Sequence, residues 1–168
     1  SLAALRALDA RAEMIFPLNY LGAVSAYLGE YASTEALCRE ALALAPGLRE
    51  RLQLVGKCGI KLVSPARPEH RIKHYDSSAA HIAASVEASL RALRTDRLDL
   101  LLIHRPDPLL DADEVARAFE SLRAAGKVRH FGVSNQTPGQ IELLKSAVKQ
   151  PLLFNQVQLS IAHANLFA

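Results

Sequence analysis

Four apolar runs in this sequence each end in residues that could do chemistry. The end residues are Lys57, His104, the pair Ser134 and Asn135, and the pair Asn155 and Gln156. Lysine and histidine side chains can take part in proton transfer, and hydroxyl and amide groups can hold a polar ligand. Taken singly, each has an ordinary structural explanation. The lysine could be solvated, the histidine could be a hydrogen-bonded structural residue, and the Ser-Asn pair could simply begin a turn.

The apolar runs themselves have the length and composition of β-strands. The segment Leu98–Ile103 is almost continuously apolar, which is typical of a strand covered on both faces. Similar runs predict further strands over Leu52–Cys58, Val128–Val133 and Leu152–Val157. The stretch Gly59–Ser78 is predicted to be a basic loop, either solvated or folded over a bound substrate.

Helix patterns separate these strands. The first of three is capped by Asp76, Ser77 or Ser78, the second by a capping box of Asp111 and Glu114, and the third by one of Thr137 and Gln140. Their predicted buried faces are Ile82, Val86, Leu90 and Leu93; Val115, Ala118, Phe119 and Leu122; and Ile141, Leu144 and Val148. A further helix is predicted to begin near Ser33.

Regular alternation of strand and helix predicts parallel strands joined by right-handed crossovers. The carboxyl ends of parallel strands share one edge, so the four sets of polar residues are expected to converge there. No GxGxxG or P-loop glycine pattern follows any strand, which argues against an open dinucleotide-binding sheet.

Composition excludes several classes of protein. The 168 residues are 50% hydrophobic and 22% charged, as in a globular domain, and a net charge of +3 is too small to indicate nucleic-acid binding. Two cysteines without metal-ligand spacing predict free thiols, no metal site and a cytoplasmic location, with Cys58 buried in its strand. The uncharged stretch Met14–Leu28 is too short and too interrupted for a membrane span.

Four segments together resemble the aldo-keto reductase family. They are Lys57-Cys58-Gly59-Ile60, Leu100-Leu101-Leu102-Ile103-His104-Arg105-Pro106-Asp107, Gly126-Lys127-Val128-Arg129-His130-Phe131-Gly132-Val133-Ser134-Asn135 and Asn155-Gln156-Val157. The resemblance implies part of a (β/α)8 TIM barrel, with about strands 2 or 3 to 6 present and outer helices around a parallel sheet. It also implies NADPH-dependent reduction of aldehydes or ketones to alcohols.

The family's catalytic tetrad of Asp, Tyr, Lys and His is only partly matched. Lys57 matches the lysine and His104 the histidine, while Ser134, Asn135 and Gln156 match residues that bind the nicotinamide carboxamide. The sequence has no aspartate between Asp9 and Asp76, so the tetrad aspartate is missing. Tyr27 reaches the tyrosine position only if the alignment is shifted.

Residues 1–32 are therefore expected to form a divergent N-terminal segment, and residues 33–168 a single incomplete barrel domain lacking strands at both ends. Three interpretations of the function follow from these departures. The first interpretation is a reductase with impaired or absent activity. The others are a non-enzymatic barrel fragment and a nucleotide-binding subunit, either of which could associate through uncovered sheet edges.

Overall fold

A computed structural model of the chain describes residues 48–51, 53–63 and 71–158. The chain divides into two compact units, one of residues 1–53 with 90–95 and the other of residues 54–89 with 96–168. In the first unit, the described residues include the short helix α4 (Leu48–Arg51). Arg49 Nε donates to Thr95 Oγ1 at 2.9 Å within this unit. The second unit contains all of the predicted strand ends.

A parallel sheet forms the centre of the second unit. Its strands are β1 (Val55–Cys58), β4 (Leu98–Ile103), β5 (Val128–Ser134) and β6 (Leu152–Gln156), hydrogen-bonded in the order β1-β4-β5-β6. All three pairings are parallel, which confirms the predicted topology. The first strand begins at Val55 rather than Leu52, and the predicted strand bounds at Val133 and Val157 shift by one residue.

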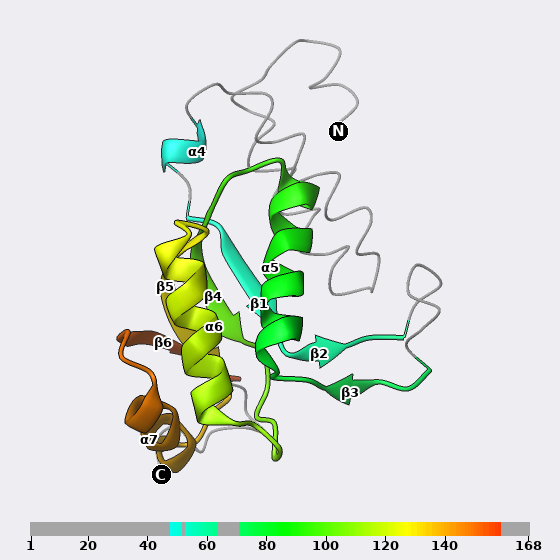
Figure 1. The fold of residues 1–168 in the computed structure, drawn as a ribbon, viewed down its shortest axis with the longest axis vertical. Coiled ribbons are helices and arrows are strands. Elements are labelled where there is room, and N and C mark those ends of the chain that lie inside the picture. Colours follow the sequence, from blue (N-terminus) through cyan, green and yellow to red (C-terminus); the bar gives the residue numbers. More distant parts are fainter. Residues whose placement is uncertain (1–47, 52, 64–70, 159–168) are drawn as a thin grey trace. The chain divides into compact units, whose positions relative to one another are not determined.

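The segment predicted to be a loop contains a second, two-stranded sheet, so that prediction was wrong in part. Strand β2 (Ile60–Lys61) pairs antiparallel with β3 (His74–Tyr75), and Figure 1 shows the two extending away from the end of β1. Lys61 Nζ lies 2.6 Å from Asp76 Oδ2, and Asp76 N donates to the Gly59 carbonyl at 3.2 Å. The pairing joins residues 13 or more positions apart, so no local sequence period reports it.

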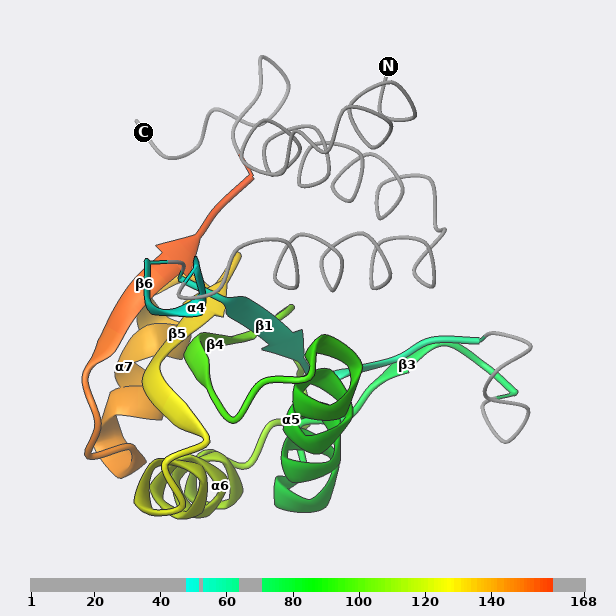
Figure 2. The same ribbon diagram turned by 90° about the horizontal axis from the view of Figure 1, so that it is seen from above.

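Three helices lie on the same side of the parallel sheet (Figure 2). They are α5 (Ala79–Leu93), which contributes residues to both units, α6 (Ala112–Ala124) and α7 (Pro138–Ala147). The ring of Phe119 on α6 stacks on that of Phe131 on β5, with centroids 4.1 Å apart, and both side chains are fully buried. The predicted buried faces are largely confirmed: Leu93 and Ile141 are half-buried and the remaining residues are buried.

The helix caps agree with the sequence in one case and differ in another. Thr137 and Gln140 form the predicted capping box at the start of α7. At the start of α6, Asp111 accepts hydrogen bonds from the backbone N–H groups of residues 113 and 114. Glu114, however, does not complete a box, because its Oε2 accepts from the Ala79 N–H of α5 at 3.1 Å. Glu114 therefore links two helices where the sequence predicted a local cap.

Cys58 is buried, as its strand position predicted, and its thiol is free. Burial raises the pKa of this thiol to about 12, so it is uncharged at neutral pH. Among the described helices, none combines the length and the apolar composition that a membrane span requires. The helix predicted near Ser33 lies outside the described residues, as does Cys38.

Candidate functional site

The register of the parallel sheet brings the predicted site residues to one edge. Lys57 is aligned with Leu102, Leu102 with Gly132, and Ser134 with Gln156. Alternate side chains of a strand point to opposite faces. Phe131 faces α6, so its neighbour Gly132 belongs to the face opposite the helices. By the register and the alternation along each strand, Lys57, Ser134 and Gln156 lie on that same face. His104 continues this edge, because its N–H donates to the Cys58 carbonyl at 2.8 Å.

The charges around His104 favour its neutral form. Burial is the largest cause that lowers the pKa of the His104 imidazole, and the positive charges of Lys57, Arg105 and Lys73 lower it further. Burial and the charge of Arg105 also lower the pKa of the Lys57 ammonium. Among the described residues, no carboxylate forms an ion pair with Lys57. A neutral imidazole beside an ammonium can donate a hydrogen bond to a carbonyl oxygen.

Removing the Lys57 charge is therefore expected to raise the pKa of His104. Lys57→Gln deletes a cation that disfavours the imidazolium form, so the pKa of His104 should shift upward. A pH titration of the histidine ring signals by NMR measures it, with His104→Gln identifying the signal. Lys145→Gln is the matched control, because Lys145 pairs with Glu142 on α7. An unchanged or lowered His104 pKa in Lys57→Gln would contradict the assigned proximity.

Ser134, Asn135 and Gln156 form one hydrogen-bonded group at the ends of β5 and β6. Ser134 Oγ donates to the Gln156 carbonyl at 3.0 Å and Asn135 Nδ2 donates to Ser134 Oγ at 3.2 Å. The Asn135 backbone also donates to the Gln156 carbonyl, at 2.9 Å, and Asn135 Oδ1 accepts from Gln158 N at 2.8 Å. Asn135 has a φ of 56°, a left-handed conformation that asparagine tolerates better than most residues. The turn therefore holds the Asn135 amide side chain in place before any ligand binds.

Asn155 has a positioning role that the sequence did not assign. Its Nδ2 donates to the Gln136 carbonyl at 2.8 Å, and its Oδ1 accepts from the Gln136 N–H at 3.3 Å. The Asn155 side chain thus binds both backbone groups of Gln136 and fixes the turn that follows Asn135. The available signal was an amide residue beside Gln156 at the end of a strand, but its partner became known only once β5 and β6 were paired.

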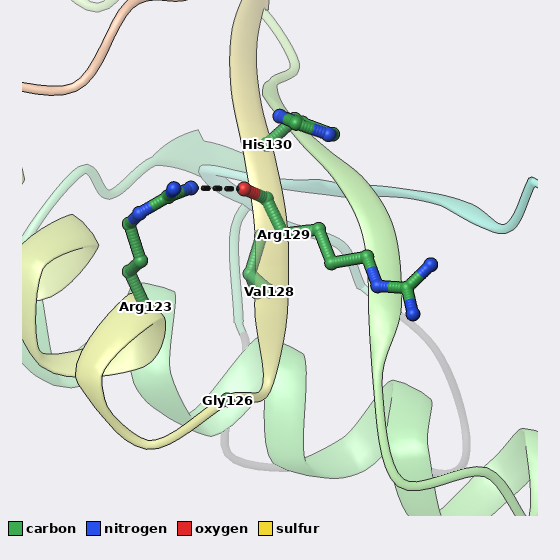
Figure 3. Close-up of a pocket in the computed structure, with 5 residues that line it drawn as sticks. All are labelled: Arg123, Gly126, Val128, Arg129 and His130. Carbon is green, nitrogen blue, oxygen red and sulfur yellow. Dashed lines mark hydrogen bonds between the residues drawn. The ribbon is translucent and has the colours of Figure 1, made fainter.

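A cavity of about 390 Å³ lies at the opposite edge of the sheet. It is lined by Arg123, Gly126, Val128, Arg129 and His130, and Val128 is the first residue of β5 whereas Ser134 is the last. Figure 3 shows Arg123 donating to the Arg129 carbonyl, with the side chains of Arg129 and His130 pointing in different directions. Because these groups do not converge on one point, the strand-end residues remain the candidate site.

The structure does not place the proton donor that the family resemblance implies. Tyr27, the candidate proton donor, lies outside the described residues. Within residues 48–51, 53–63 and 71–158, no group of three or more His, Cys, Asp or Glu side chains could hold a metal ion. The described part of the site therefore consists of Lys57, His104 and the Ser134–Asn135–Gln156 group.

Comparison with known proteins gives consistent matches. Residues 20–166 match the model of the Aldo/keto reductase family. The oxidoreductase YdhF of Escherichia coli strain K12 is 58% identical over 132 residues, which are 79% of this chain and 44% of that protein. The chain therefore spans less than half the length of this relative.

Solved structures match the fold as well. The glycerol dehydrogenase of Gluconobacter oxydans is 32% identical with a TM-score of 0.68, over 81% of this chain and 40% of that one. An aldo/keto reductase from Klebsiella pneumoniae, solved with NADP and acetate, is 30% identical with a TM-score of 0.52, over 70% and 35% of the two chains. The described sheet and outer helices thus form part of the α/β barrel that the sequence predicted.

Proposed function

Because this chain belongs to the aldo/keto reductase family, we propose that its strand-end site binds NADPH and reduces aldehyde or ketone carbonyls to alcohols. One observation carries the proposal: strand pairing and the backbone hydrogen bonds at the strand ends bring Lys57, His104, Ser134, Asn135 and Gln156 to the carboxyl-terminal edge of the sheet. In barrels of parallel strands, this carboxyl-terminal edge is where active sites are built.

Each described residue has a role in this proposal that its surroundings support. Neutral His104 donates a hydrogen bond to the substrate carbonyl and orients it, and the adjacent Lys57 ammonium favours the negative charge that develops on that oxygen. The family's proton donor is a tyrosine, for which Tyr27 is the candidate in this chain. Burial and the positive charge of Arg105 lower the pKa of Lys57, so the ammonium loses its proton more readily and gives less assistance to that acid.

The hydrogen-bonding groups at the end of β5 and β6 fit a nicotinamide carboxamide. Asn135 Nδ2 donates one of its two hydrogens to Ser134 Oγ, so the second hydrogen is available to donate to a ligand. Gln156, whose backbone carbonyl accepts from the Asn135 N–H, is exposed. Bound NADPH would supply the hydride. Binding of NADP by the Klebsiella pneumoniae structure supports this choice of cofactor.

Fluorescence titration with NADPH, followed by turnover of 4-nitrobenzaldehyde, tests the proposal. We expect NADPH binding, with turnover about 10²–10⁴-fold below that of a reductase with a complete tetrad, because the general acid is not matched in place. His104→Ala should abolish the remaining turnover, and Lys145→Gln on α7 should leave it unchanged. NADPH oxidation that is the same in His104→Ala and in the unmodified chain would exclude this site as its source.

A second candidate function is a binding subunit that assembles through its outer strands. Two exposed apolar side chains favour it: Val55 on β1 is 52% exposed and Phe154 on β6 is 58% exposed. The same titration separates the candidates, since NADPH binding without turnover supports the subunit. Absence of both supports a non-enzymatic fragment of the barrel.

A further inference from the structure

We propose that Asn155 is a positioning residue that sets how tightly the site holds a nicotinamide carboxamide, acting from the opposite face of the sheet. It acts through Asn135, whose Nδ2 has a hydrogen to donate to the carboxamide oxygen. The inference rests on the proposed function for the identity of the ligand. The effect of Asn155 on Asn135 itself can be measured without any cofactor.

Asn155 lies on the face of the sheet that carries the helices. It is aligned with Val133 of β5, whereas its neighbour Gln156 is aligned with Ser134. Alternate residues of a strand point to opposite faces, and Ser134 and Gln156 lie on the face away from the helices. The Asn155 side chain is therefore turned away from a ligand that lies against Ser134 and Gln156. Its influence on that ligand has to pass through the backbone of the turn.

Both hydrogen bonds of the Asn155 side chain go to the backbone of Gln136, the residue after Asn135. The Gln136 N–H, which donates to Asn155 Oδ1 at 3.3 Å, belongs to the planar peptide unit that joins Asn135 to Gln136. This bond therefore fixes the ψ angle of Asn135. On the other side, the Asn135 N–H donates to the Gln156 carbonyl at 2.9 Å. Because β6 holds both peptide units that flank Asn135, the direction of the Asn135 Cα–Cβ bond is fixed.

The turn needs this support because its conformation is unfavourable by itself. Asn135 has a φ of 56°, a left-handed conformation that strains any residue with a Cβ atom, asparagine less than most. Gln136 is only 6% exposed, and its Nε2 has no hydrogen-bond partner among the described residues, which disfavours its burial. The turn is therefore held by backbone hydrogen bonds, two of which Asn155 supplies.

A fixed Asn135 side chain is suited to binding a carboxamide. Asn135 Oδ1 accepts from the Gln158 N–H at 2.8 Å, and Nδ2 donates one hydrogen to Ser134 Oγ at 3.2 Å. The second Nδ2 hydrogen of the planar amide is thus held in one direction. A ligand that accepts this hydrogen does not have to order the side chain first, which favours its affinity. Loss of the Asn155 contacts would release the Asn135 backbone and move this hydrogen out of line.

Amide hydrogen exchange of the full chain without cofactor tests the positioning. Asn155→Ala should speed exchange of the Asn135 and Gln158 N–H groups about tenfold, because both are bonded only while the turn is in place. Gln140→Ala is the matched control, since the Gln140 amide binds the Thr137 N–H at the other end of the turn. It should speed exchange at Thr137 and leave the other two groups unchanged. Unchanged exchange at Asn135 and Gln158 in Asn155→Ala would overturn the inference.

Calorimetric titration with two ligands tests the link to the carboxamide. One ligand is NADP⁺, and the other is its analogue with hydrogen in place of the carboxamide. Asn155→Ala should weaken NADP⁺ about three- to tenfold, the effect of one ordinary hydrogen bond, and leave the analogue unchanged. Gln140→Ala should alter neither affinity. An unchanged NADP⁺ affinity in Asn155→Ala, or an equal loss for both ligands, would contradict the carboxamide role.

A second variant covers the case in which Asn155→Ala does not fold. Asn155→Asp keeps an acceptor for the Gln136 N–H, but an ionised carboxylate has no hydrogen to donate to the Gln136 carbonyl. It should therefore speed exchange at Asn135 and Gln158 and weaken NADP⁺ more than the analogue. The absence of both effects in a folded Asn155→Asp chain would count against the inference in the same way.

The two proposals fail in different ways. If neither ligand binds but Asn155→Ala still speeds exchange at Asn135 and Gln158, the cofactor assignment fails and the positioning of Asn135 by Asn155 stands. If NADP⁺ binds and exchange at these two groups does not change, the positioning role fails and the reductase assignment stands.

Discussion

Replacing Phe119 by alanine should cost about 3–5 kcal/mol in the free energy of unfolding. Phe119 is fully buried on α6, and its ring stacks on Phe131 of β5 with centroids 4.1 Å apart. The substitution removes this ring and leaves a cavity between helix and sheet, so both hydrophobic transfer and packing are lost. Small domains are stable by about 5–15 kcal/mol, so a loss of this size removes much of the total. Urea unfolding followed by circular dichroism at 222 nm measures the change.

Leu143→Ala is the matched control for this experiment. Leu143 lies on α7 and is 54% exposed, so truncating it should change the free energy of unfolding by about 0.5 kcal/mol or less. An effect of Phe119→Ala no larger than that of Leu143→Ala would mean that α6 does not pack on β5 as the structure describes.

Gly132→Ala should destabilise the chain by about 1–3 kcal/mol or more, through overpacking at the centre of the sheet. A Cβ atom at Gly132 would lie 2.6 Å from the Phe154 carbonyl oxygen and 2.8 Å from Leu102 Cδ2. The nearer of these atoms is backbone, which cannot move without disturbing the pairing of β5 with β6. Thermal unfolding monitored by circular dichroism gives the change in stability.

The same substitution also tests how the site is held. Gly132 lies two residues before Ser134, and its partner Phe154 lies two residues before Gln156. Spreading the strands at this point should therefore weaken the contact between Ser134 and Gln156 and reduce NADPH affinity. Gly139→Ala on α7 is the control, because a Cβ there meets nothing within 4 Å. In a helix the added methyl should stabilise by a few tenths of a kcal/mol up to about 1 kcal/mol. Equal stability in the two alanine variants would contradict the described close approach of β6.

The sequence was most informative where structure depends on nearby residues. The strand Leu98–Ile103 is predicted with its observed bounds because a continuous apolar run is sufficient to indicate a buried strand. The Thr137–Gln140 capping box is likewise local, since its two groups lie three residues apart. Strand–helix alternation then predicted parallel pairing, and parallel pairing was sufficient to place Lys57, His104, Ser134 and Gln156 at one edge.

The sequence could not assign partners across long separations. Glu114 has the spacing of a local cap, yet it accepts from Ala79, 35 residues away, because the starts of α5 and α6 lie close together. The β2–β3 hairpin has two residues in each strand, too few for an alternating pattern to be recognised. Asn155 could be identified as a polar strand-end residue, but its hydrogen bonds to the Gln136 backbone depend on the pairing of β5 with β6.

By itself, therefore, the sequence determined the order of the four parallel strands and the helices between them, the family, and the strand-end residues, because each follows from periodicity or from short motifs. Only the tertiary structure decided that the charge of Lys57 acts on His104 and which groups the carboxylates of Asp107 and Glu114 bind. Those contacts join residues far apart in the chain, and their partners are chosen by sheet register and helix placement rather than by spacing along the sequence.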